Sequence, residues 1–416
     1  MQVYKFGGAS VATAEGVKNI TSIILNQTDF PIVVISAMGK MTNAFEKLLE
    51  GFISLDADRK SKELKTITAF HENIISDLGM GSSSHYNHFI DDLKNELSVS
   101  NISTHDYDWW YDRIVGYGEM LSTSIISDYL SFIGVENTLL ESRKLIITDG
   151  RFREANINFA KTEVNLRSVV NSHQIYVLQG FIAGTAEGDF TTLGREGSDY
   201  TAAAVANMLS CESVTIWKDV EGVLNADPRI FSDCVLIPAL SYVDAVELAF
   251  SGAQIIHPKT IKPLQNKDIP LHVRSFLNPS HAGSVICDVG KERVKVPIVI
   301  MRKNQILISI RPKDFSFVLE ESLQNIFTLL NNYRQKVNVI QGSAVRISVS
   351  VDASRYFDDL MAELSKDYRV KYNDNLELIT LRGDYKDVES KHTVGYDIYI
   401  RQETRRALRL LRKSPK

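Results

Sequence analysis

The 416-residue sequence has few of the features that mark secreted, disulfide-linked or membrane-spanning proteins. Its three cysteines, Cys211, Cys234 and Cys287, are far apart and odd in number. That pattern indicates a reducing compartment and offers no metal site. No run of about 18 apolar residues is present, so we expect no membrane partner. The opening MQVYKFGG lacks the basic, apolar and small-residue regions of a signal peptide, and we therefore expect a cytoplasmic protein.

An excess of charge of one sign is also missing. The net charge is −4, and a chain without a basic excess is not expected to bind nucleic acid. Hydrophobic residues make up 44% and charged residues 24% of the chain, as in soluble globular proteins, and the length predicts about two or three domains. The basic tail, residues 405–416, contains RRALRLLRK and is interpreted as a solvated helix end, with binding to an acidic partner as the alternative.

Up to residue 287, short apolar runs alternate with helical patterns. The runs are Val3–Phe6, Ile32–Ile35, Ile175–Gln179, Val214–Trp217 and Leu271–Val273. Continuous apolar runs separated by helices predict a mainly parallel α/β sheet that is covered on both faces. The polar segment 56–110 has a helical tendency and is predicted to be a helical subdomain or lid.

The composition changes near residue 288. The segments that follow are strand Gln305–Ile310, helix Phe317–Tyr333, strands Val337–Ile340 and Val345–Val351, helix Tyr356–Leu364 and strand Leu376–Leu381. This βαββαβ order predicts an α+β, ferredoxin-like domain. After it we expect a strand at 396–401 and either a helix or a last strand at 403–411.

Three polar clusters follow predicted strands. In Lys5–Ser10, KFGGAS, two glycines allow a close turn whose backbone N–H groups and lysine suit an anion, although a tight strand–helix turn also explains the pattern. In Thr192–Asp199 an arginine and two glycines lie at a predicted helix start, where the arginine can bind a carboxylate or a phosphate. Alternatively, Asp199 only stabilises the N-terminus of the helix. Trp217–Arg229 leaves a strand as a polar loop, the usual place for ligands in open α/β sheets; the alternative is a charged surface turn.

Together these clusters resemble the amino-acid kinase superfamily and, within it, the aspartate kinases. The matching segments are KFGGAS at 5–10, VVISAMGKMTN at 33–43, GYGEMLS at 116–122, TTLGREGSDYTAA at 191–203, WKDVEGVLNADPR at 217–229 and SGAQIIHP at 251–258. The segments occur in order over almost the whole chain. The resemblance implies a three-layer α/β/α amino-acid kinase domain at 1–287 that phosphorylates L-aspartate with ATP.

The resemblance also implies roles for single residues. Lys5 should contact the transferring phosphate, with Asp199 holding it in place. The residues expected to contact the substrate are Ser36, Thr42, Glu119, Arg195 and Ser198, with Glu119 on the α-ammonium and Arg195 on the α-carboxylate. The residues expected along ATP are Lys5, Gly7, Gly8, Lys218, Asp219, Leu224, Arg229, Gln254 and Ile255.

Two residues depart from the family pattern. Glu196 stands where relatives have glycine and adds negative charge, and Gln254 replaces a lysine for which Lys259 or Lys262 would substitute.

The accepting carboxylate is already ionised at pH 7, so no general base is needed and His257 is expected to pack structurally. Catalysis should depend on positioning and on the positive charges of Lys5 and Mg²⁺, which bind the phosphate oxygens. Because Mg²⁺ is expected to travel mainly on the ATP phosphates, we assign no protein ligand to it.

The C-terminal region 298–416 resembles the ACT regulatory domains of these kinases. One full ACT domain is expected at about 303–382, and a shortened second one from about 297–302 and 383–416. The resemblance implies an amino-acid effector and a homodimer. Relatives often carry Asp and Glu where Asn338 and Ala344 stand, so we expect weak inhibition by lysine alone, with threonine or a pair of amino acids as effector.

Two other interpretations remain open. Another amino-acid kinase, acting on glutamate or acetylglutamate, is disfavoured by the ACT-like region and by the pair Glu119 and Arg195. An amino-acid sensor with a decayed kinase domain is disfavoured by Lys5, Arg195 and Asp199, and favoured by Glu196 and the loss of the lysine at position 254.

Overall fold

The computed structural model describes residues 1–26, 30–99, 102, 105–171, 173–253, 256–290, 294–314, 317 and 320–414. The chain forms two compact units. The first unit contains Met1–Val223, Pro238–Val246 and Ile255–Gly290, and the second contains Leu224–Ile237, Glu247–Gln254 and Lys291–Lys416. Among the described residues, no helix has the length and apolar character needed to cross a membrane.

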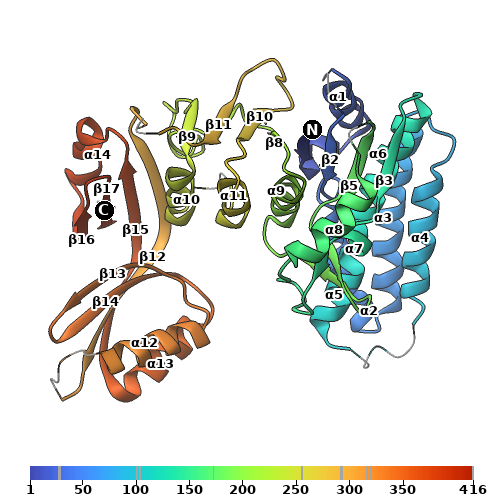
Figure 1. Cartoon of the computed structure of the whole chain (residues 1–416). Helices are drawn as coiled ribbons and strands as arrows, with labels where there is room; N and C mark the ends of the chain where they lie inside the picture. The colour runs from blue at the N-terminus through green and yellow to red at the C-terminus, as the bar shows by residue number, and fades with distance from the viewer. Residues whose placement is uncertain are drawn as a thin grey trace. The chain divides into compact units, whose positions relative to one another are not determined.

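The first unit is built on an eight-stranded sheet (Figure 1). In spatial order its strands are β3 (Asn137–Leu140), β5 (Ile175–Gln179), β2 (Ile32–Ile35), β1 (Gln2–Phe6), β8 (Ser213–Lys218), β10 (Leu271–Ser275), β11 (Ser284–Cys287) and β9 (Ala239–Ser241). Neighbours run parallel except β10 and β11. The predicted mainly parallel sheet and its five predicted strands are confirmed.

Helices cover both faces of this sheet. On one face, Tyr4 and Phe6 of β1 share a hydrophobic cluster with α1 (Ala14–Leu25), α2 (Met41–Ile53), α3 (Ala57–Asp77), α4 (Ser84–Glu96), α5 (Tyr107–Val115) and α6 (Tyr117–Phe132). On the other face α9 (Gly197–Leu209) packs on β1, β2 and β8, and it is flanked by α8 (Phe159–Val169) and α11 (Pro258–Gln265). Because side chains alternate along a strand, Lys5 points toward the α9 face.

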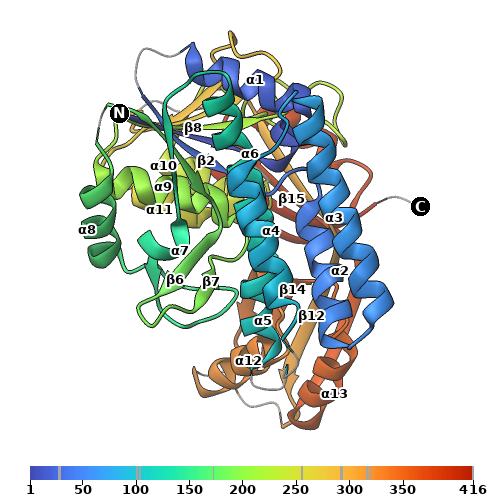
Figure 2. The same cartoon turned by 90° about the vertical axis from the view of Figure 1, so that its right-hand side faces the viewer.

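Smaller elements complete the first unit. They are η1 (Gly8–Val11), α7 (Ser142–Leu145), α10 (Tyr242–Ser251, whose last residues belong to the second unit) and a three-stranded sheet of β4 (Ile147–Thr148), β6 (Ile182–Thr185) and β7 (Phe190–Thr192). The helical character predicted for 56–110 is confirmed, since α3 packs along α2 and α4 along α6 (Figure 2). Its function as a lid stays a prediction.

The second unit has an antiparallel sheet of six strands. In spatial order these are β13 (Val337–Ser343), β14 (Arg346–Asp352), β12 (Ile298–Pro312), β15 (Tyr368–Arg382), β17 (Ala407–Lys413) and β16 (Asp397–Glu403). Helices α12 (Glu320–Asn332) and α13 (Phe357–Asp367) pack on β12 and β14 through one hydrophobic cluster. The predicted ferredoxin-like βαββαβ order is therefore confirmed.

Two strands are longer than predicted. β12 and β15 each have 15 residues and pair along their lengths, with register shifts between Arg302 and Leu307 (Figure 1). Asn304 and Asn375 adopt left-handed conformations, with φ 56° and 54°, which asparagine tolerates better than most residues. The chain therefore bends without ending either strand. Beyond the bend the sheet carries only short helical turns, η3 (Lys386–Val388) and α14 (Glu389–Thr393).

The interpretation of 405–413 as a solvated helix end is wrong, and the alternative of a last strand is correct. β17 lies between β15 and β16, and its leucines are buried. Arg412 is only 2% exposed; it pairs with Glu377 at 3.1 Å and its guanidinium carbon lies 3.5 Å from the ring centre of Tyr396. The dense positive charge suggested solvent exposure, but neighbouring groups satisfy this arginine inside the sheet.

His71 provides a test of the helical layer. Its ring is buried in α3, where Nδ1 lies 2.8 Å from the carbonyl oxygen of Ile67, and burial lowers its pKa from 6.5 to about 4. As the pH falls, the unfolded chain therefore binds a proton before the folded chain does. Between pH 6.5 and 4 this should remove about 3 kcal/mol of unfolding free energy.

We expect the variant His71→Leu to lose less stability than the parent over this range, measured by urea unfolding at several pH values. The control is His88→Gln, because the His88 side chain is two-thirds exposed on α4. Equal pH slopes for the parent and His71→Leu would contradict the assignment.

Candidate active site

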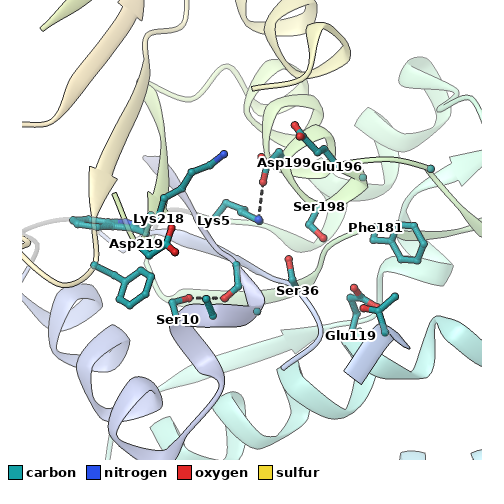
Figure 3. A pocket seen from close by; sticks show the side chains of 18 residues that line it. Lys5, Ser10, Ser36, Glu119, Phe181, Glu196, Ser198, Asp199, Lys218 and Asp219 are labelled. Carbon is teal, nitrogen blue, oxygen red and sulfur yellow. Dashed lines mark hydrogen bonds and ion pairs between the residues drawn. The ribbon is translucent and has the colours of Figure 1, made fainter. Parts of the chain in front are cut away.

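The first unit contains a cavity of about 420 Å³ at the carboxyl ends of β1, β2 and β8 (Figure 3). This volume lies within the range of small-molecule sites, and the position is the usual one for ligands of open α/β sheets. The predicted site residues that line it are Lys5, Gly7, Gly8, Ser36, Thr42, Glu119, Ser198, Asp199, Lys218 and Asp219.

The other predicted site residues are not among the described residues that line the cavity. Arg195 is exposed on the turn before α9 and does not line the cavity, although its neighbours Gly194 and Glu196 do. Leu224 and Arg229 belong to the second unit, where Arg229 pairs with Asp227 at 2.8 Å. Gln254 and Ile255 are outside the described residues.

Lys5 and Asp199 form an ion pair inside the cavity. The Lys5 Nζ lies 2.6 Å from Asp199 Oδ1, and the two side chains are 12% and 5% exposed. Lys5 reaches the pair because it points toward α9, and Asp199 stands in the first turn of that helix, where the helix dipole stabilises a carboxylate. The pair places one fixed positive charge at the cavity wall.

The glycine turn after β1 is held close to the loop after β2. The Gly39 N–H donates to the Gly8 carbonyl oxygen at 2.9 Å, and the Ser10 hydroxyl donates to the Gly7 carbonyl oxygen at 2.6 Å. A Cβ atom at position 8 would lie only 2.6 Å from the carbonyl oxygen of Ala37. Glycine is therefore required at position 8 for this approach of two backbones.

Glu119 brings an incompletely paired carboxyl group to the cavity. Its Oε1 accepts from the Ala37 N–H at 3.1 Å, whereas Oε2 is buried and accepts no hydrogen bond within the part of the chain that the structure describes. Burial raises the pKa of Glu119 to about 8, against the opposing effect of the Ala37 hydrogen bond and the Lys5 charge. A cation that enters beside Oε2 would favour the ionised form.

The backbone conformation at position 196 would suit glycine better than glutamate. Glu196 has φ 53°, a left-handed conformation that costs an L-residue about 1–2 kcal/mol. Its side chain lines the cavity, and Oε2 accepts from the His257 N–H at 2.8 Å. His257 is the residue before α11, so this hydrogen bond links the starts of α9 and α11. The hydrogen bond stabilises the Glu196 carboxylate in this position.

Three aromatic residues of the cavity wall were missed in the sequence. Phe181 follows β5, Trp217 is near the end of β8 and Phe276 directly follows β10. Each stands at the carboxyl end of a strand that the sequence predicts. Because ligands of open α/β sheets bind at these ends, the position of each aromatic residue after a predicted strand is the signal that identifies it.

Comparisons with known proteins identify the family of the chain. The sequence model of the Amino acid kinase family matches residues 1–275. The chain is similar to Aspartokinase 2, chloroplastic, of Arabidopsis thaliana, at 30% identity over 414 residues that cover 92% of this chain and 74% of the relative. It is also similar to Lysine-sensitive aspartokinase 3 of Escherichia coli (strain K12), at 28% identity over 95% of this chain and 90% of that protein.

A solved structure extends the similarity to the fold. The crystal structure of E. coli aspartokinase III in complex with aspartate and ADP matches with a TM-score of 0.84 at 26% sequence identity. The match covers 99% of this chain and 96% of that chain.

The left-handed conformation of Glu196 predicts that a glycine variant is more stable than an alanine variant at this position. Glu196→Ala loses the acceptor for the His257 N–H and keeps the left-handed strain, whereas Glu196→Gly loses the acceptor and relieves the strain. We expect the glycine variant to be more stable than the alanine variant by about 1 kcal/mol, the reverse of the order in a helix interior. Chemical denaturation of both variants would measure the difference. An alanine variant that equals or exceeds the glycine variant would contradict the strained conformation.

Proposed function

We propose a function from one premise: this chain belongs to the amino acid kinase family and, within it, to the aspartokinases. The proposed reaction transfers the γ-phosphoryl group of ATP to the β-carboxylate of L-aspartate and gives 4-phospho-L-aspartate. In the cell this is the first step of lysine, threonine and methionine biosynthesis. We place the protein in the cytoplasm as a homodimer.

The observation that carries the proposal is the order of groups across the cavity. In the view of Figure 3, Lys218 and Asp219 lie on one side, Glu119 and Phe181 on the other, and Lys5 between them. A nucleotide on the first side and an amino acid on the second would bring their reacting groups together near Lys5. This arrangement suits transfer between two bound molecules.

The nucleotide side is proposed to hold the ATP phosphates. The close glycine turn at Gly7 and Gly8 allows a phosphate to approach the backbone, and the Lys5 ammonium faces the charge that develops during transfer. Lys218 and Asp219 line the same side. We further propose Leu224, Arg229, Gln254 and Ile255 as nucleotide contacts, on the resemblance alone.

No general base is assigned. The β-carboxylate of aspartate is ionised at pH 7, so its oxygen can form the new bond to phosphorus while the bond between that phosphorus and the bridging oxygen of ADP breaks. Within the described residues, no group of three or more His, Cys, Asp or Glu side chains is arranged to hold a metal ion. Charge neutralisation by Mg²⁺ is proposed to come with the phosphates, which would supply most of its ligands.

The amino-acid side is proposed to recognise both ends of aspartate. Oε2 of Glu119, which accepts no hydrogen bond from the described residues, suits the α-ammonium group. Ser36, Thr42 and Ser198 offer hydroxyl groups in the same cavity. Arg195 is proposed for the α-carboxylate, and this role requires its side chain to turn from the exposed position toward the bound substrate.

The second unit is proposed to be regulatory. We propose a catalytic domain at 1–287 and an ACT region at 298–416, with one full ACT domain at about 303–382 and a shortened one from 297–302 and 383–416. An amino-acid effector would bind in this region, but the structure supports a departure from ordinary lysine inhibition. The Asn338 amide donates to Gln305 Oε1 at 2.9 Å and to Asp352 Oδ1 at 3.1 Å, so it is already engaged inside the sheet.

The function is tested by measuring ADP release with aspartate, glutamate and acetylglutamate, with hydroxylamine trapping of the acyl phosphate. Aspartate-dependent ADP release with a trapped hydroxamate is the expected result. Preference for glutamate or acetylglutamate would assign the chain to another amino-acid kinase. The absence of ADP release, together with binding of amino acids, would favour the sensor interpretation.

Replacing the central cation should stop phosphoryl transfer. In Lys5→Met the cavity loses the charge that faces the transferring group, an effect of several kcal/mol, so kcat should fall more than about tenfold while the fold is retained. Lys18→Met is the matched control, because Lys18 is half-exposed on α1. Steady-state kinetics and circular dichroism check both variants. A Lys5→Met enzyme with more than about a tenth of the parent kcat would remove Lys5 from the mechanism.

Aspartate binding should release a proton through Glu119. In the free protein its pKa is about 8, so it is mostly protonated at pH 7, and pairing with the substrate ammonium favours ionisation. Below pH 8 the affinity for aspartate should therefore rise with pH, by up to about tenfold per unit.

Isothermal titration calorimetry in buffers of different ionisation enthalpy would count the proton. Glu119→Gln is the control, since it should bind aspartate more weakly and without proton release. Proton release that persists in this variant would assign the effect to another group.

A further inference from the structure

The buried side chain of Asp112 accepts hydrogen bonds beside the turn before α9, and no sequence pattern indicates these bonds. This α5 residue is 2% exposed and does not line the cavity. Its Oδ2 accepts from the N–H groups of Arg153 at 2.8 Å and Thr192 at 2.9 Å. Its Oδ1 accepts from the Thr192 hydroxyl at 2.6 Å. One buried carboxylate therefore joins α5, the end of β7 and the 149–156 loop.

The segments that Asp112 joins are those that shape the turn at 192–196, which leads into the first residues of α9. Thr192 is the first residue of this turn, and its carbonyl oxygen accepts from the Ala155 N–H at 3.0 Å. Arg153 is held in a left-handed conformation with φ 68°, and its carbonyl oxygen would lie 3.1 Å from a Cβ atom at Gly194. The 149–156 loop thus forms a backbone wall along the turn, and Asp112 fixes both sides of this contact.

We propose that Asp112 is a positioning residue for the amino-acid substrate: it fixes the turn that carries Arg195 and Ser198. The proposal rests on the proposed function, which assigns those two side chains to aspartate. Asp112 itself touches neither substrate. It acts through Thr192, from which the turn runs directly to Arg195.

The chemistry of the contacts explains why the effect should be local. Alanine at position 112 leaves two backbone N–H groups without an acceptor, and such groups seek water. Arg153 and Arg195 are already exposed, so the backbone next to them can shift toward solvent while the buried residues Ala155 and Leu193 stay in place. Asparagine can keep the contacts, because its carbonyl oxygen accepts the N–H groups and its amide donates to the Thr192 hydroxyl.

A suitable control exists on α6. Asp128 also accepts from a hydroxyl and a backbone N–H, those of Ser83 at 2.5 Å and His85 at 3.0 Å. It does not line the cavity, and it lies nine residues beyond Glu119, about 13 Å along the helix. Asp128→Ala therefore removes a comparable carboxylate without reaching the turn.

The test compares steady-state kinetics of Asp112→Ala, Asp112→Asn and Asp128→Ala in the full chain. For Asp112→Ala we expect the KM for aspartate to rise about tenfold, with kcat and the KM for ATP changed less than about threefold. Asp112→Asn should recover most of the aspartate KM, and Asp128→Ala should leave it unchanged. Thr192→Val, which removes one of the three contacts, should raise it about threefold and serves if Asp112→Ala does not fold.

Hydrogen exchange separates this proposal from the proposed function. Amides of 193–198 should exchange faster in Asp112→Ala than in the parent, and at the parental rate in Asp128→Ala. Faster exchange in a chain without aspartate kinase activity would support positioning of the turn and overturn the proposed function. Unchanged exchange, an unchanged aspartate KM, or equal effects of Asp112→Ala and Asp128→Ala would overturn the positioning role.

Discussion

Burying the ammonium group of Lys5 costs several kcal/mol unless a carboxylate lies within contact distance, and Asp199 lies 2.6 Å away. This pairing constrains much of the first unit. Because side chains alternate along β1, the lysine faces the layer of α9, so that helix has to start where β1 ends. The turn before α9 must then reach this point, and Asp112 and the glycine turn hold its surroundings in place.

The cavity joins two carboxyl groups whose surroundings differ. Asp199 has a cation in contact, whereas Glu119 Oε1 accepts from the Ala37 N–H and its buried Oε2 accepts no hydrogen bond among the described residues. Desolvation therefore dominates at Glu119 and raises its pKa. In the free protein Glu119 is therefore a largely neutral acid at pH 7, and it becomes a negative charge when a cation arrives beside Oε2.

The sequence predicted those parts of the structure that depend on local patterns. The apolar runs of β1, β2, β5, β8 and β10 and the order of the ferredoxin-like elements follow from periodicity. Ten predicted site residues line one cavity because parallel strands bring their carboxyl ends together. The roles of those residues stay proposals.

What was missed depends on contacts between distant segments. The bond from His257 to Glu196 joins residues 61 apart, and that from Thr192 to Asp112 joins residues 80 apart. No local pattern signals either one. The basic tail was misread for the same reason, since the partner that allows Arg412 to be buried, Glu377, lies 35 residues earlier. The exposed position of Arg195 could not be predicted either. It depends on the conformation of the turn before α9, and residues from other segments contact this turn.

The bend at Asn304 and Asn375 has a thermodynamic consequence for the second unit. Since β12 and β15 continue through it, no linker separates the part of the sheet that packs on α12 and α13 from the part that contains β16 and β17. Unfolding either part would break hydrogen bonds between β12 and β15, and these two strands also belong to the other part. The two parts should therefore fold cooperatively, and a molecule that binds one of them would change the free energy of the other through the shared backbone.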